Sequence, residues 1–188
     1  YYTRAVNAVK KGSDQAPYAF VIPAGQGDAT KVDRVVNLLR LQAIEVRRAT
    51  AEFKVQEGTF PAGTYVVKLN QPYGPLAKTL LERQVYPDPA LNTYDDSAWT
   101  MGLANQVDVK TIADRAVLDA PADLLTTDTT TAGTAPAAAP GGMLIVRQNG
   151  ALNLITLRYR LKDVFWIFTI IRKLAGKFQK LFLFFIMI

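Results

Sequence analysis

The chain has 188 residues, of which 49% are hydrophobic, and a formal net charge of +6. Such a chain can bury one full-sized hydrophobic core or two small ones. Histidine and cysteine are both absent, which excludes imidazole-based zinc sites, disulfides and the Ser-His-Asp triad within this chain. Much of the positive charge lies in the last 25 residues, so we expect no nucleic-acid partner.

The first residues follow a helical pattern. Apolar residues recur at helical spacing from Tyr2 to Val9, and the pair Lys10-Lys11 before Gly12 is typical of a last turn followed by a glycine stop. We therefore expect a helix that ends at Gly12. The chain starts at Tyr1 rather than Met and lacks a signal-peptide pattern, so we also expect it to be part of a longer protein.

Residues 18–47 predict a strand, a helix and a second strand. Residues 18–22 are an apolar run that ends at Pro23, which is typical of a buried strand. Apolar residues then recur at helical spacing from Val32 to Leu39, and residues 44–47 alternate as in a half-covered strand. This order is that of a βαβ unit. We therefore expect an α/β fold with a mainly parallel sheet built from βαβ units.

The loop between the first strand and its helix is the candidate ligand site. It consists of Gly25, Gln26, Gly27 and Asp28. Glycines here are typical of nucleotide-binding loops, but Thr30 stands at the third glycine of that motif, and Thr30-Lys31 replaces the Gly-Lys of a phosphate loop. A plain loop in which Asp28 caps the helix is therefore favoured. If the fold binds a ligand, we expect it in this crevice, beyond the carboxyl ends of the strands.

The next segment predicts short β elements and a helix. Residues 53–60 are typical of a small β-hairpin that turns near Glu57-Gly58. Residues 64–69 are rich in β-branched and aromatic side chains and predict a strand, and residues 73–84 have leucines at helical spacing.

Residues 91–115 are less regular and carry two further candidates. Asp95 and Asp96 are adjacent, so in an extended segment they point to opposite faces, and we interpret them as turn or capping residues rather than a catalytic carboxylate pair. Tyr94 and Trp99 fit either a ligand-stacking platform or an aromatic pair that closes the core.

The composition predicts four parts. Residues 1–119 form an α/β domain with an N-terminal helix, and residues 120–142, rich in Ala, Pro and Thr, form a flexible linker. Residues 143–163 start a second, partial α/β unit, with a strand at 143–146 and a helix whose apolar face includes Ile155 and Tyr159. Residues 164–188 are a hydrophobic tail.

The tail has three interpretations. Its cations and its apolar residues fall on opposite sides of a helix, which is typical of an amphipathic basic helix lying on a membrane surface. Alternatively the tail packs on the α/β core, or a shifted reading frame has replaced the true continuation. The frame shift is favoured, because the composition changes abruptly within the second unit.

Several runs together resemble one region of a known family. They are APYAFVIP at 16–23, VVNLLR at 35–40, EVRRA at 45–49, FPAGTYVV at 60–67, QPY at 71–73, LLERQVYPD at 80–88 and YDDSAWT at 94–100. They resemble the region after the catalytic domain in large bacterial proteins of the zinc carboxypeptidase (carboxypeptidase A-like) family. In that family this region is similar to a class I glutamine amidotransferase-like α/β domain that lacks the catalytic residues.

The resemblance implies a non-catalytic role for this chain. The family's zinc ligands, an H-x-x-E pair and a later His, and its catalytic Glu belong to the preceding domain and match no position here. We therefore expect no catalytic, cofactor-binding or metal-binding residue in this chain, zinc being held in the parent's catalytic domain.

The implied role is that of an accessory region of a secreted or periplasmic protein. It would pack on the preceding peptidase domain and shape access to the peptide's end. Two alternatives stay open: a stand-alone α/β module that binds a small molecule or a peptide, and a membrane-surface protein that acts through residues 164–188.

Overall fold

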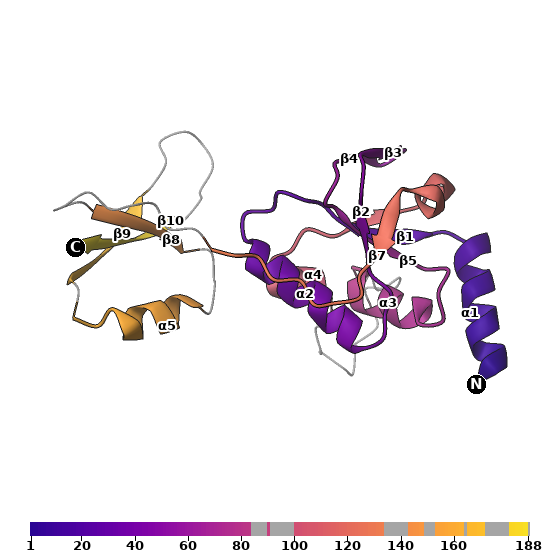
Figure 1. Cartoon of the computed structure of the whole chain (residues 1–188), viewed down its shortest axis with the longest axis horizontal. Coiled ribbons are helices and arrows are strands. Elements are labelled where there is room, and N and C mark those ends of the chain that lie inside the picture. The colour runs from indigo at the N-terminus through magenta and orange to yellow at the C-terminus, as the bar shows by residue number, and fades with distance from the viewer. Residues whose placement is uncertain are drawn as a thin grey trace. The chain divides into compact units, whose positions relative to one another are not determined.

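A computed structural model describes residues 1–83, 90, 100–133, 143–148, 153–163, 165–171 and 181–187. The chain divides into two compact units, Tyr1–Thr131 and Ala132–Ile188 (Figure 1). The first unit contains α1 (Tyr2–Asp14), β1 (Ala19–Ile22), α2 (Ala29–Leu41), β2 (Arg47–Ala49), β3 (Phe53–Val55), β4 (Gly58–Phe60), β5 (Tyr65–Lys68), α3 (Gly74–Leu81), α4 (Met101–Asn105), β6 (Lys110–Ile112), the 3₁₀ helix η1 (Arg115–Asp119) and β7 (Ala122–Leu124). The second unit contains β8 (Met143–Gln148), α5 (Asn153–Arg160), β9 (Phe165–Ile171) and β10 (Leu181–Met187).

The first unit is a mixed α/β structure around a five-stranded sheet of order β6-β1-β5-β2-β7. All four adjacent pairs are antiparallel, so the expectation of a mainly parallel sheet with βαβ units is wrong. The reason is the position of β5, where Val66 pairs with Val21 of β1 on one side and with Arg47 of β2 on the other. β1 and β2 do run in the same direction and are joined through α2, but β5 separates them.

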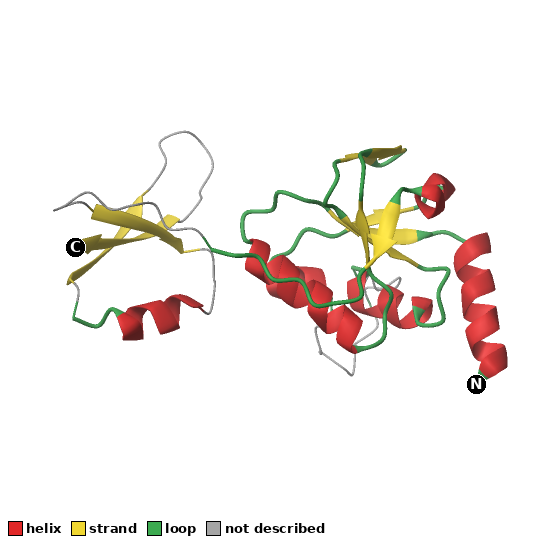
Figure 2. Cartoon of the chain, in the orientation of Figure 1, coloured by secondary structure: helices red, strands yellow, loops and turns green. Residues whose placement is uncertain are grey.

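Both faces of this sheet are covered, which explains the wholly apolar β1. Phe20 and Ile22 pack in the core with α2 and α3, whereas Ala19 and Val21 pack with β3, β4 and η1. Figure 2 shows α2 and α3 on one side of the sheet and the β3–β4 hairpin on the other. The predicted hairpin is confirmed, since Phe53 pairs with Phe60 and Val55 with Gly58.

The sequence predicted that helix α1 ends at Gly12, but the helix continues to Asp14. Gly12 is buried, and a Cβ atom at this position would lie 2.1 Å from the carbonyl oxygen of Leu69. The glycine therefore lets the helix pack closely against Leu69, and it is not a stop signal. The helix ends where Gln15 adopts an extended conformation and its N–H donates to the Lys11 carbonyl at 2.9 Å.

The first unit extends past the predicted boundary at residue 119. Residues 122–124, which the sequence assigned to a flexible linker, form the edge strand β7 and pair with β2. The Leu125 N–H then donates to the Val46 carbonyl at 2.9 Å, and the segment as far as Thr131 is hydrogen-bonded to α2. The linker interpretation therefore fails from residue 120 to Thr131, and residues 134–142 lie outside the described residues.

The second unit has a three-stranded antiparallel sheet of order β8-β10-β9. The predicted strand and helix are present as β8 and α5. The half-buried side chains of α5 are Leu154 and Leu157, whereas Ile155 and Tyr159 are 61% and 78% exposed. The helical spacing of Ile155 and Tyr159 is confirmed, since both lie in α5, but both side chains are exposed.

The tail forms strands where the sequence suggested a helix. β9 and β10 pair along their whole length, with Phe165 opposite Met187 at one end and Ile171 opposite Leu181 at the other. Both strands are continuous runs of aromatic and β-branched or other large apolar residues, and this strand propensity outweighs the helical spacing. Residues 172–180, which carry the four cations of the tail, lie outside the described residues, and membrane contact and a shifted frame remain predictions. Among the helices described, none has the length and apolar character needed to cross a membrane.

Candidate functional site

The loop predicted as a ligand crevice has a clear structural role. Asp28 is the N-cap of α2, as predicted, and its Oδ1 accepts a hydrogen bond from the Thr30 N–H at 3.0 Å. Gly25 has φ +77°, a conformation that favours glycine. Both features fix the turn from β1 into α2.

Gln26 in the same loop is bonded to the segment that leads into β6. Its Nε2 donates to the carbonyls of Asp108 at 3.0 Å and Pro23 at 3.2 Å, and its Oε1 accepts from the Asp108 N–H at 2.8 Å. The polar atoms of this side chain are thus directed at the protein itself. None of Gly25, Gln26, Gly27 and Asp28 lines the pocket described next.

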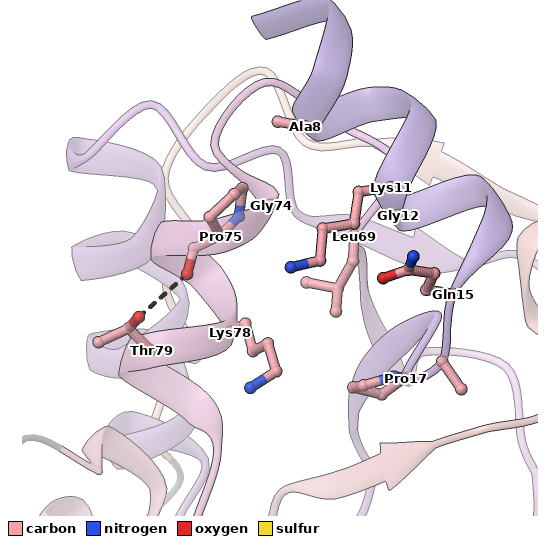
Figure 3. Close-up of a pocket in the computed structure, with 11 residues that line it drawn as sticks. Ala8, Lys11, Gly12, Gln15, Pro17, Leu69, Gly74, Pro75, Lys78 and Thr79 are labelled. Carbon is pink, nitrogen blue, oxygen red and sulfur yellow. Dashed lines mark hydrogen bonds between the residues drawn. The ribbon is translucent and has the colours of Figure 1, made fainter. Parts of the chain in front are cut away.

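A pocket of about 240 Å³ lies between α1 and α3. One wall is the C-terminal half of α1 and the turn after it, and the other is Leu69 with the first two turns of α3 (Figure 3). Two glycines shape it, because Cβ atoms at Gly12 and Gly74 would each lie 2.1 Å from the same Leu69 carbonyl oxygen. The absence of side chains there lets both helices approach the end of β5.

The pocket combines apolar walls with cationic side chains. Ala8, Pro17, Leu69 and Pro75 supply apolar surface. Figure 3 shows Lys11 and Lys78 extending from the two helices into the space between them.

The polar groups of the pocket differ in how they are bonded. Lys78 pairs with Glu82 one turn later, and the Thr79 hydroxyl donates to the Pro75 carbonyl at 3.1 Å. Within the described part of the chain, the Lys11 amine has neither a hydrogen bond nor an ion pair. No acidic residue lines the pocket, so its electrostatic field favours an anion.

Lys68 on β5 is a second notable cation. Its side chain lies on the face of the sheet that packs against η1, away from α3 and the pocket. Its Nζ donates to the Leu118 carbonyl at 2.6 Å and the Ala120 carbonyl at 3.4 Å, at the end of η1. Burial lowers the pKa of Lys68, the Arg47 guanidinium lowers it further, and Asp119 opposes both effects. Because the amine is already hydrogen-bonded to two backbone carbonyls, we assign it a structural role.

Four of the sequence candidates fall in a part of the chain that the structure does not describe. Tyr94, Asp95, Asp96 and Trp99 lie outside the described residues. In the described ranges no group of three or more His, Cys, Asp or Glu residues is placed to hold a metal ion.

The α1–α3 pocket was not predicted from the sequence. Lys11 was interpreted as a residue of the last helical turn, and Gly12 as a stop. A glycine inside a helical pattern often has a packing reason, and this was the available signal. Nothing in a single sequence, however, pairs residues 8–17 with residues 69–79.

Comparison of the chain with protein-family models, with curated proteins and with solved structures finds no match.

Proposed function

We propose that this chain is a non-catalytic accessory region of a secreted or periplasmic zinc carboxypeptidase-like protein. It packs on the preceding peptidase domain and shapes access to the end of the peptide substrate. Support comes from the family resemblance of the runs between residues 16 and 100, and from a sequence without histidine or cysteine. Zinc and the catalytic Glu are supplied by the preceding domain.

The observation that carries the docking role is the uncovered face of α1. Tyr2 and Val6 are four residues apart, so they share one face of the helix, and they are 84% and 46% exposed. Tyr1 is also fully exposed. Exposed aromatic side chains are enriched at protein interfaces. In the proposal α1 is the element next to the peptidase domain, so this face is the natural contact.

The experiment starts from the coding DNA upstream of Tyr1. We expect it to encode a domain with an H-x-x-E pair, which is then purified and titrated with this chain by isothermal calorimetry. Replacing Tyr2→Ser together with Val6→Ser should raise the Kd at least about tenfold, because interface aromatics contribute most of the binding energy. The matched control replaces two exposed leucines elsewhere, Leu41→Ser with Leu103→Ser, and should leave the Kd within about twofold.

Two results would overturn the proposal. One is an upstream sequence without a zinc-binding domain. The other is zinc-dependent release of C-terminal residues from peptides by this purified chain alone.

A further inference from the structure

We propose that the pocket between α1 and α3 binds a small organic carboxylate that carries an apolar group. This inference does not depend on the accessory role, because it rests on the lining of the pocket alone. The occupant is defined by three properties of the pocket: its charge, its apolar walls and its size.

The charge favours a monoanion. Lys11 and Lys78 both reach into the space between the helices, and no acidic residue lines it. Lys78 shares its charge with Glu82, whereas the Lys11 amine has no partner in the described ranges. About one positive charge is therefore uncompensated, which suits one carboxylate rather than a polyphosphate. The Gln15 side chain, also in the lining, adds a neutral amide donor.

The walls favour an apolar group next to that carboxylate. Leu69 forms part of the pocket between the helices, and Pro17 and Pro75 flank it from the two sides. Burial of apolar ligand surface against such walls supplies the non-directional part of the affinity, and the amine fixes the orientation of the anion.

The volume limits the size of the occupant. Drug-sized ligands occupy pockets of about 300–1,000 Å³, and this one has about 240 Å³. It therefore accepts a molecule of modest size, or the last residue of a peptide chain, which presents the same chemistry of a carboxylate beside an apolar side chain. The test below distinguishes these two sources.

The test titrates 4-phenylbutyrate into the ¹⁵N-labelled full chain at low salt and follows the backbone amides by NMR. We expect saturable shifts confined to α1 and α3, with a Kd below about 1 mM. The neutral analogue 4-phenylbutanamide should bind at least about tenfold more weakly, because it cannot pair with the amine. N-acetylphenylalanine serves as the mimic of a peptide end. Tighter binding of this probe than of phenylbutyrate identifies a peptide terminus as the source, and weaker binding identifies a free acid.

Variants at Lys11 separate charge from fold. Lys11→Met keeps the apolar stem and should weaken phenylbutyrate binding at least about tenfold, whereas Lys11→Arg should restore it. The matched control is Lys10→Met, an adjacent exposed lysine outside the pocket lining, which should change the Kd less than about twofold. Equal binding of the acid and the amide, unchanged affinity in Lys11→Met, or no saturation at about 10 mM ligand would overturn the proposal.

Discussion

The side-chain amide of Asn37 pairs with the backbone of Thr129 in both directions. Asn37 Nδ2 donates to the Thr129 carbonyl at 2.9 Å, and the Thr129 N–H donates to Asn37 Oδ1 at 2.9 Å. One turn earlier on α2, the buried Asp33 accepts from the Thr131 N–H at 2.6 Å, and Arg40 pairs with Asp128. Polar side chains on one face of α2 therefore fix the segment 128–131 against the helix through hydrogen bonds and an ion pair.

Asn37→Ala should release this segment. Both backbone hydrogen bonds are lost, together with a longer one from the Thr129 hydroxyl to Asn37 Oδ1 at 3.4 Å. We therefore expect the free energy of unfolding to fall by about 1–2 kcal/mol in urea titrations. The protection of the Thr129 amide from hydrogen exchange should fall as well. Asn7→Ala on the exposed face of α1 is the control, since it makes the same change in helix propensity without these bonds. Equal stability of the two variants would show that the hydrogen bonds between Asn37 and Thr129 do not stabilise the fold.

Gly12→Ala and Gly74→Ala should each destabilise the first unit. Each new methyl group would lie 2.1 Å from the Leu69 carbonyl oxygen, so a helix must move away from β5. We expect a loss of about 1–3 kcal/mol, which exceeds the gain in helix propensity. Gly27→Ala is the matched control because its Cβ would meet no atom within 4 Å. A Gly12→Ala variant as stable as the wild type would refute the close contact.

Gln71→Ala should destabilise the link between β5 and the start of β2. Gln71 is buried, its Oε1 accepts from the Glu45 N–H at 2.6 Å, and its Nε2 donates to the carbonyls of Glu45 at 3.0 Å and Lys68 at 2.6 Å. Removing the amide leaves these backbone groups without a partner, so we expect a loss of about 1–3 kcal/mol by thermal unfolding. Gln56→Ala, at an exposed turn position, should change stability by less than about 0.5 kcal/mol.

Lys68 should give the fold an alkaline pH dependence. Burial holds its pKa below the ordinary value of 10.5, so between these two pKa values the unfolded chain binds a proton that the folded chain does not. Stability then rises with pH through this window, whereas below it the partly desolvated charge is a constant cost.

The measurement compares wild type with Lys68→Met. Their difference in unfolding free energy should move in favour of the wild type as the pH rises toward 10.5. Lys54→Met, which removes an exposed lysine from β3, controls for the loss of one positive charge. A difference that stays constant with pH would show that burial does not perturb the Lys68 amine.

Local elements were readable from the sequence where one signal dominated. The apolar run before Pro23 is β1, Asp28 caps α2, and the segment around Glu57-Gly58 is a hairpin. The second strand was displaced, since β2 begins at Arg47, although Ile44 and Val46 are buried as expected of core residues. Strand pairing was not readable, because the patterns that mark a strand do not say which strand lies beside it.

The strands of the tail and the α1–α3 pocket were not predicted from the sequence, for two different physical reasons. In residues 165–171 two signals competed, and the strand propensity of a run such as Phe-Trp-Ile-Phe outweighed the helical spacing. The pocket depends on Gly12 and Gly74 meeting one carbonyl of Leu69. That contact joins distant segments, and it exists only once the sheet has formed.

The placement of β5 between β1 and β2 governs when the sheet can assemble. During synthesis β1 and β2 emerge first but have no partner until residues 65–68 leave the ribosome, and the flanking strands β6 and β7 follow still later. Nascent chains arrested before Tyr65 therefore carry the apolar residues of β1 unpaired, which makes them natural clients for a chaperone. Pairing within this sheet must therefore wait for its central strand, which is the third of the five along the chain.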